Sequence, residues 1–243
     1  MPLKAALIAI ILVVNHSGPT TAFLTGMEGY VLRVQTNDSV AIKAIVLRDE
    51  FVNKIKGMGF DPGKHPPAIR FDNPRSYGNY DADSNILHTS DWNTLDAESR
   101  ERFNVAASSI GKGVTGEKYF ELSVHKWIFI HELGHWWRAC QNQTAKPYEN
   151  EMAANRIAIA FWREKDSTFM AFKLAGYQRY LTMIPSPVPS GVSKVDYLNN
   201  NYENLPGGQA YTWYQATMIV DGCKEIPPPT FHQVIERAGN SRD

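Results

Sequence analysis

The sequence predicts an α+β protein with a small N-terminal sheet and a mainly helical C-terminal half. Short apolar runs bounded by turn residues occur before residue 91, which is the pattern of strands. Beyond residue 116, apolar residues recur at helical spacing. With 243 residues, 43% of them apolar, the chain is long enough to form one well-packed domain.

The N-terminal part of the chain is expected to contain three strands and two helices. Strands are expected at 30–36, 68–72 and 85–90. Apolar residues at helical spacing predict a first helix, with Asp38 or Ser39 as its N-cap. The segment between the last two strands is rich in turn residues, and a second helix is expected to follow Asp96.

Three longer helices and three shorter ones are expected in the C-terminal half. The longer helices are predicted at about 120–140, 148–164 and 167–183, and the shorter ones at 195–202, 210–220 and 229–238. A linker rich in Pro, Ser and Gly, 184–193, separates the two groups. The expected organisation is therefore a core of residues 23–183 and a helical subdomain, 184–243, that packs on it, since so short a segment is marginal alone.

The first 22 residues have the pattern of a secretory signal peptide. Lys4 precedes the apolar run Ala5 to Val14, and Thr20 and Ala22 are the small residues of a cleavage site. The run is far shorter than the ~20 residues that span a bilayer as a helix. We therefore expect a secreted or periplasmic protein with no membrane span after cleavage; an uncleaved anchor and a buried N-terminal strand are the alternatives.

Charge and cysteine content narrow the function classes. Lys plus Arg and Asp plus Glu both number 25, and no basic run is present, so a nucleic-acid partner is not expected. Two cysteines, Cys140 and Cys223, together with an export signal predict a single disulfide. Two buried free thiols are the alternative.

The segment HELGH, His131 to His135, is the strongest candidate site. In a helix, residues four apart lie on one face, so both imidazoles can converge on one tetrahedral ion. Glu132 then lies beside the metal, where it can take a proton from a metal-bound water. The alternative is a helix with two satisfied core histidines and a surface acid, but polar groups in an apolar helix are costly without partners.

A third ligand is expected on the next helix. Arg138 and Gln141 stand where the metzincin pattern requires Gly and His, which excludes that pattern. Glu151 is the preferred ligand, because Asn155 lies four residues further and can accept a hydrogen bond from a ligating histidine. Glu149 is the competitor, and it faces roughly 200° away on the same helix.

HELGH followed by E-x-x-A-N-R-x-A resembles the gluzincin zinc metallopeptidases, and is most similar to their short forms with a minimal catalytic core. The matching residues lie between Lys126 and Phe161. The resemblance implies a zincin-like core, Zn²⁺ bound by the two histidines and Glu151, and Glu132 as general base. The downstream family motif commonly reads E-x-x-x-D; here Asn155 can orient an imidazole but supplies no negative charge.

Two further parts of a peptidase site are predicted. The segment 84–90 is a candidate for the edge strand that pairs with substrate, with an ordinary structural strand as an equal alternative. Tyr211 is the candidate oxyanion donor and Tyr214 the other choice, although either can instead pack in an aromatic core. His88 and His232 are expected to have no catalytic role.

These observations predict an exported zinc peptidase acting on a peptide or protein substrate. They leave the oligomeric state open, with a monomer as the default. One alternative is a zinc-binding regulatory or binding protein that has the peptidase fold and little turnover. Another is a helical export protein without a metal.

Overall fold

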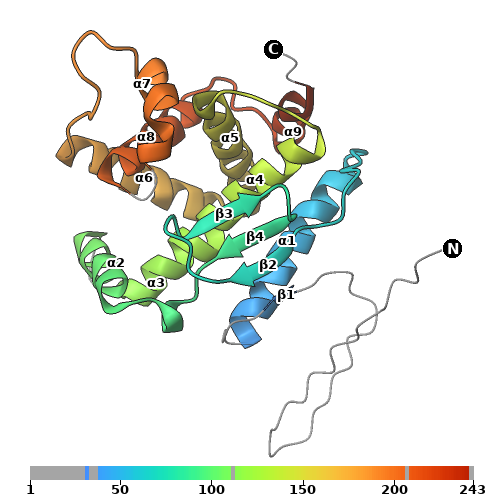
Figure 1. Ribbon diagram of the computed structural model, residues 1–243, viewed down its shortest axis with the longest axis horizontal. Helices are drawn as coiled ribbons and strands as arrows, with labels where there is room; N and C mark the ends of the chain where they lie inside the picture. The colour runs from blue at the N-terminus through green and yellow to red at the C-terminus, as the bar shows by residue number, and fades with distance from the viewer. Residues whose placement is uncertain (1–30, 33–37, 111–112, 206–207, 241–243) are drawn as a thin grey trace, which may run out of the picture.

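The computed structural model describes residues 31–32, 38–110, 113–205 and 208–240 (Figure 1). Over these residues the protein is α+β and mostly helical, with one small sheet, which confirms the predicted class. The expected signal peptide, 1–22, lies outside the described residues. No helix within the described ranges has both the length and the apolar character needed to span a bilayer.

Four short strands form the sheet in the order β1-β2-β4-β3. They are β1 Val31–Leu32, β2 Ala68–Phe71, β3 Gly78–Asp81 and β4 Ile86–Thr89. The pairs β1–β2 and β2–β4 are parallel, whereas β3 runs antiparallel to β4, with Gly78 opposite Thr89. The edge strands of the sheet are therefore β1 and β3.

Strand β3 was not predicted, and its presence corrects the expectation for the substrate strand. The segment 84–90 contains β4, which lies between β2 and β3 and has both edges paired. The sequence of β3, Gly-Asn-Tyr-Asp, has weak strand propensity. It forms a strand because it pairs with β4 through a turn in which the Asp81 carboxylate accepts the Asp83 and Ser84 N–H groups at 3.0 and 3.5 Å.

The helices match most of the predicted ranges. They are α1 Asp38–Gly57, α2 Ala97–Ile110, α3 Gly116–Phe120, α4 Phe129–Cys140, α5 Pro147–Lys165, α6 Ser167–Met183, α7 Lys194–Asn201, α8 Gln209–Cys223 and α9 Phe231–Asn240. Side-chain caps fix several N-termini: Asp96 accepts the Ser99 N–H at 2.6 Å, and Asp166 accepts the Phe169 N–H at 2.9 Å. Pro147 occupies the first turn of α5, where its missing N–H is not needed.

The predicted helix 120–140 is continuous but not uniform. Between α3 and α4 the chain forms a π-helix, Glu121–Ile128. In this wider segment Val124 and Trp127 are buried, and the His125 ring bonds to the Ser90 carbonyl at 2.8 Å, just beyond β4. The π-helix therefore ties the sheet to the start of α4.

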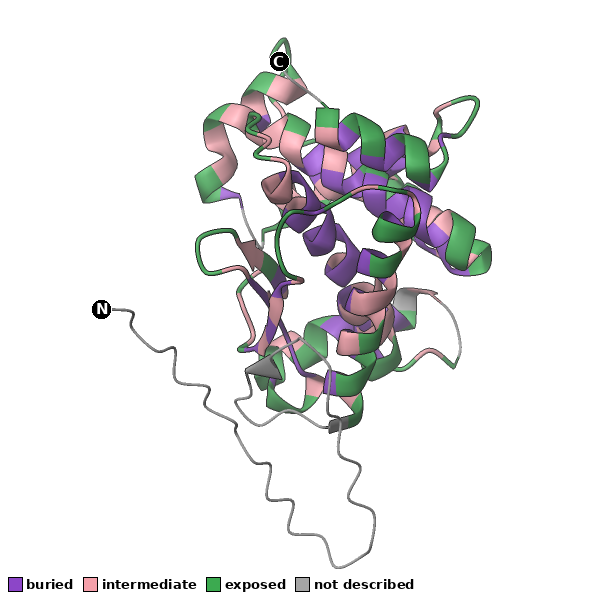
Figure 2. Cartoon of the chain, turned by 90° about the vertical axis from the view of Figure 1, so that its right-hand side faces the viewer, coloured by how far each residue is buried: buried purple, intermediate pink, exposed green. Residues whose placement is uncertain are grey.

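Helix α4 is the centre of the molecule, between the sheet and the group of helices α5 to α9 (Figure 1). Figure 2 shows buried residues concentrated on the inner helices and exposed residues on the outer ones. The Trp137 indole N–H donates to the Ile235 carbonyl at 3.0 Å, which joins α4 to α9. Helices α8 and α9 both pack on α5.

Two glycines permit close contacts with α4. A Cβ at Gly134 would lie 3.0 Å from the Ala154 Cα, so α4 and α5 touch backbone to backbone. A Cβ at Gly78 would lie 2.3 Å from Cγ2 of Ile128, so β3 rests directly on the end of the π-helix. Both glycines are favoured by space rather than by backbone conformation, and at Gly78 a Cβ would clash outright.

Lys173 of α6 is a buried cation surrounded by aromatic rings. It is 4% exposed, and its ammonium lies 4.7 Å from the Tyr177 ring centroid and 6.0 Å from that of Trp127. The Ser123 hydroxyl lies 3.4 Å from Nζ. Burial lowers the pKa of Lys173 to about 7, since removal from water disfavours the charged form.

Replacement of Lys173 by Met is expected to stabilise the fold most at acid pH. Below about pH 7 the lysine is charged in both folded and unfolded states, and its burial costs on the order of 5 kcal/mol before the rings offset part of it. Between pH 7 and the unfolded pKa of 10.5 the unfolded state binds more protons, so wild-type stability rises with pH. The gain from Lys173→Met should be about 2 kcal/mol at pH 6 and should shrink by pH 9.5.

Denaturant unfolding at the two pH values measures this difference. Lys126→Met is the matched control, because Lys126 forms an ion pair with Asp166 at 3.1 Å and its loss should not stabilise the protein. An equal gain for Lys173→Met at both pH values would show that Lys173 keeps an ordinary pKa.

Candidate metal centre

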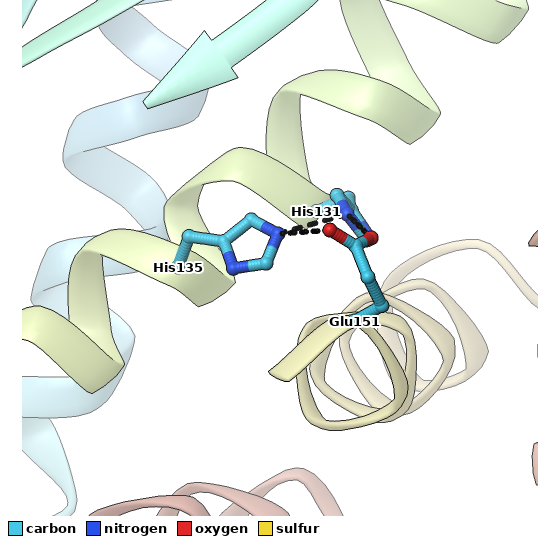
Figure 3. A group of neighbouring side chains, drawn as sticks. All are labelled: His131, His135 and Glu151. Carbon is cyan, nitrogen blue, oxygen red and sulfur yellow. Dashed lines mark hydrogen bonds and ion pairs between the residues drawn. The ribbon is translucent and has the colours of Figure 1, made fainter. Parts of the chain in front are cut away.

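Three side chains from α4 and α5 converge on one point (Figure 3). His131 and His135 lie one turn apart on α4, and Glu151 lies in the second turn of α5. The His131 Nε2 atom is 3.1 Å from the His135 Nε2 and 3.1 Å from the Glu151 Oε2, and the His135 Nε2 is 3.6 Å from the Glu151 Oε1. All three side chains are largely buried.

These spacings fit a tetrahedral zinc ion. Metal–ligand bonds of about 2.0–2.1 Å at the tetrahedral angle place neighbouring ligand atoms about 3.3 Å apart. The observed separations of 3.1, 3.1 and 3.6 Å bracket that value. Two imidazole nitrogens and one carboxylate oxygen are also a donor set of catalytic zinc sites, in which a fourth position stays open.

A chain of side-chain amides sets the tautomer of His131. The Gln215 Nε2 donates to the Glu151 carboxylate at 2.7 Å, so the Gln215 Oε1 faces Asn155 and accepts from its Nδ2 at 2.8 Å. The Asn155 Oδ1 then lies 3.2 Å from the His131 Nδ1, which must carry the hydrogen. The His131 Nε2 therefore directs its lone pair toward the site.

The same assignment leaves two acceptors facing each other. With the hydrogen on Nδ1, the His131 Nε2 and the Glu151 Oε2 both offer lone pairs across 3.1 Å. Such a contact needs a proton or a cation between the two atoms. This opposed pair is the observation in the structure that points most directly to a bound cation.

The ionisation states of His135 and Glu151 suit metal binding. Burial by itself would lower the pKa of His131, but the Glu151 carboxylate outweighs it and raises that pKa, so a metal ion there would displace a proton. Burial, as the largest effect, lowers the pKa of His135 to about 4, so its ring is neutral at pH 7. Burial by itself would raise the pKa of Glu151, but the adjacent histidines and the Tyr202 hydroxyl outweigh it and hold that pKa well below its usual range. An anionic carboxylate and a neutral imidazole are the forms that bind a metal.

Glu132 lies beside this cluster and takes no part in it. Its Oε2 accepts the Tyr80 backbone N–H of the edge strand at 2.9 Å. Burial is the main cause that raises the pKa of Glu132 to about 7, and the Glu151 charge adds to it, while His131 and the Tyr80 N–H oppose it. A buried carboxylate that titrates near neutrality is suited to proton transfer.

Glu132 and His135 line a cleft of about 400 Å³. Residues of β3 and the loop before it form one wall, and the hydroxyl-bearing rings of Tyr202 and Tyr211 form part of another. The Tyr211 hydroxyl donates to the Glu151 Oε2 at 3.2 Å, and the Tyr202 hydroxyl donates to the Oε1 at 2.5 Å. The structure therefore brings the predicted donor Tyr211 to the site.

Tyr202 and Gln215 were not identified from the sequence. Tyr202 follows α7 in a polar segment, and Gln215 lies one turn after Tyr211 on α8, in phase with it. That i+4 spacing is a signal that was available. Tyr202 carries no comparable signal, because its position depends on how the C-terminal helices pack on α5.

The other candidates lie away from the cluster. Glu149 is exposed and lines a separate cavity. The Tyr214 hydroxyl donates to the Lys194 carbonyl at 2.9 Å and its ring packs in an apolar cluster. The His88 Nδ1 contacts the Asp72 carboxylate at 2.7 Å, and the His232 ring lies against Phe60.

The predicted disulfide between Cys140 and Cys223 is not present in the structure, where both residues are free thiols. Cys140 ends α4 beside Tyr80 and Lys64, whereas Cys223 ends α8 beside Arg163. The two thiols thus have different neighbours at the margin of the main core. Burial raises the pKa of both thiols, which disfavours the reactive thiolate form.

Comparisons of the chain with models of protein families, with curated proteins and with solved structures gave no match.

Glu151→Gln is expected to weaken zinc binding by about 10- to 100-fold, because the amide removes the anionic ligand. Glu149→Gln is the matched control: the same change on the same helix, at an exposed residue outside the cluster. Competition with a chromophoric chelator measures both affinities. Equal affinities for Glu151→Gln and wild type would exclude Glu151 as a ligand.

Proposed function

We propose that this protein is a zinc-dependent peptidase of the gluzincin type with a zincin-like core. The observation that carries the proposal is the convergence of His131, His135 and Glu151 on one point, with the Glu132 carboxylate beside them and facing a cleft. A purely structural zinc site has no need for an adjacent buried base.

Zinc bound there supplies a Lewis acid that activates water and polarises the substrate carbonyl. Glu132 is the base in this proposal. The Tyr80 N–H fixes one oxygen of the carboxylate at 2.9 Å, and the residue lines the cleft. The other oxygen takes a proton from the water that attacks the peptide carbonyl and transfers it to the nitrogen of the leaving amine. A cation near Glu132 brings its pKa down from about 7, so the carboxylate is ionised at neutral pH.

Strand β3 is the proposed platform for the substrate backbone. It is an edge strand of the sheet, and it lines the cleft next to Glu132. An extended peptide can add to such an edge by main-chain hydrogen bonds, which select conformation more than sequence. Because β3 also donates to Glu132, the same strand positions both substrate and base.

Tyr211 and Tyr202 are the proposed donors to the oxygen that becomes negative in the transition state. Their hydroxyls lie at the metal cluster, where both now donate to Glu151. A cation bound to the Glu151 carboxylate would reduce its negative charge and weaken these hydrogen bonds. One of the two hydroxyls could then donate to the substrate oxygen. Tyr211 keeps the role predicted for it, with Tyr202 as a second donor.

Export is proposed from the leader-like sequence alone, and the expected mature N-terminus is Phe23. The alternative function, a zinc-binding regulatory protein with little turnover, is favoured by one observation. Glu151 already receives hydrogen bonds from Tyr202, Tyr211 and Gln215, an arrangement that would rigidify a structural site.

Glu132→Gln separates these functions. The variant should keep its zinc, because Glu132 is not a ligand, and should lose about 10²- to 10⁴-fold in kcat/KM on peptides. Zinc content by atomic absorption and hydrolysis of a fluorogenic peptide library are measured on the same samples, with Glu149→Gln as control. Full hydrolysis by Glu132→Gln would sink the mechanism, and wild-type protein that binds zinc without cleaving any peptide would favour the regulatory role.

A further inference from the structure

Arg138 is a buried cation that lacks a counter-charge. The residue is 4% exposed. Its Nε donates to the Asn150 Oδ1 at 3.0 Å, and among the residues that the structure describes no carboxylate forms an ion pair with its guanidinium. Desolvation alone accounts for the lowered pKa of Arg138, with no acidic neighbour opposing it. Burying a charge without a partner is strongly unfavourable.

The other deeply buried cations of the described chain are satisfied in other ways. Arg48, 1% exposed, donates to the Asp49 carboxylate at 2.8 Å and to the Pro67 carbonyl at 3.1 Å. Lys173 lies among aromatic rings and can release its proton. A guanidinium cannot lose its proton at physiological pH. Arg138 is therefore the buried cation whose partner is missing.

The position of Arg138 connects this missing partner to the metal centre. His131, His135 and Arg138 are spaced i, i+4 and i+7, so they share one face of α4. Arg138 lies about 4.5 Å further along the helix axis than His135. It lines the metal cleft and also a neighbouring cavity of about 820 Å³.

Asn150 holds the guanidinium in this place. Its side chain accepts from the Arg138 Nε and also makes a hydrogen bond that raises the pKa of His135. One amide thus positions a metal ligand and the cation together. With Nε engaged, the two terminal nitrogens of Arg138 remain to bind a planar anion in bidentate geometry.

The neighbouring cavity is also positively charged. Besides Arg138, its lining includes Lys146, Arg156 and Arg237, against the single acid Glu149. The surroundings therefore favour an anionic group at this end of the cleft.

We infer that Arg138 binds a carboxylate of the substrate, one or two residues from the bond that is cleaved. The inference rests on the proposed peptidase function and names its substrate class. An extended peptide advances about 3.3 Å per residue. The axial offset of about 4.5 Å between His135 and Arg138 therefore corresponds to one or two residues of the substrate. The carboxylate belongs either to the C-terminus of a peptide or to an Asp or Glu side chain.

Three peptides of one sequence distinguish these sources. The first ends in a free carboxylate two residues after the scissile bond, the second ends there in a carboxamide, and the third is a carboxamide with Asp as its last residue. Zinc-loaded wild type should cleave the first or the third with about 10- to 100-fold higher kcat/KM than the second. The preferred peptide identifies the source of the carboxylate.

Variants test whether Arg138 is responsible. In Arg138→Gln the ratio of kcat/KM between the preferred carboxylate peptide and the carboxamide peptide should fall to near one. Arg138→Lys should keep part of this preference, because the charge remains while the bidentate geometry of the guanidinium is lost. Arg156→Gln is the matched control, since Arg156 lines the neighbouring cavity but already bonds to Glu225 at 2.6 Å. Zinc content and thermal unfolding confirm that each variant is folded.

Binding of fluorescein-labelled versions of the three peptides, measured by anisotropy, keeps this inference separate from peptidase activity. Tighter binding of a carboxylate peptide that Arg138→Gln abolishes supports the inference even if nothing is cleaved, and in that case the peptidase proposal fails alone. Wild type that neither binds nor cleaves carboxylate peptides better than the carboxamide overturns the inference, as does a preference that Arg138→Gln leaves unchanged.

Discussion

The backbone contact between α4 and α5 brings together the three side chains of the candidate metal centre. At Gly134 the two helices approach until a Cβ would lie 3.0 Å from the Ala154 Cα. A Cβ at this position would require α5 to shift by a few tenths of an ångström, and a larger side chain would move Glu151 further from His131 and His135. The helical spacing of α4 brings the two histidines together, whereas Glu151 joins them only through the close approach of α5.

Burial imposes a second constraint, because each polar group at the centre needs a partner. Gln215 and Asn155 form a chain of hydrogen bonds from the Glu151 carboxylate to the His131 ring. This chain fixes the tautomer of His131 without adding a charge. An acid in place of Asn155 would put a second negative charge next to Glu151. The amide thus reduces charge repulsion in the buried site, while the orientation of the imidazole is kept.

Local patterns predicted the helical ranges and the pairing of His131 with His135, because both follow from the periodicity of a single helix. Features that depend on contacts between distant segments were missed. The strand that begins at Gly78 has weak propensity and exists through its pairing with β4. Tyr202 and Gln215 reach Glu151 only because the C-terminal helices pack on α5. The sequence thus predicted the grouping of His131, His135 and Glu151, but not the residues that surround it.

The contact at Gly78 has a consequence for how this cleft can vary. Only glycine fits against Ile128, so sliding β3 by one residue would place Asn79 or Tyr77 where no side chain has room. The strand register is locked, and with it the distance between β3 and Glu132. Insertions in the turn 82–85 can therefore change the shape of the cleft while Glu132 stays in place.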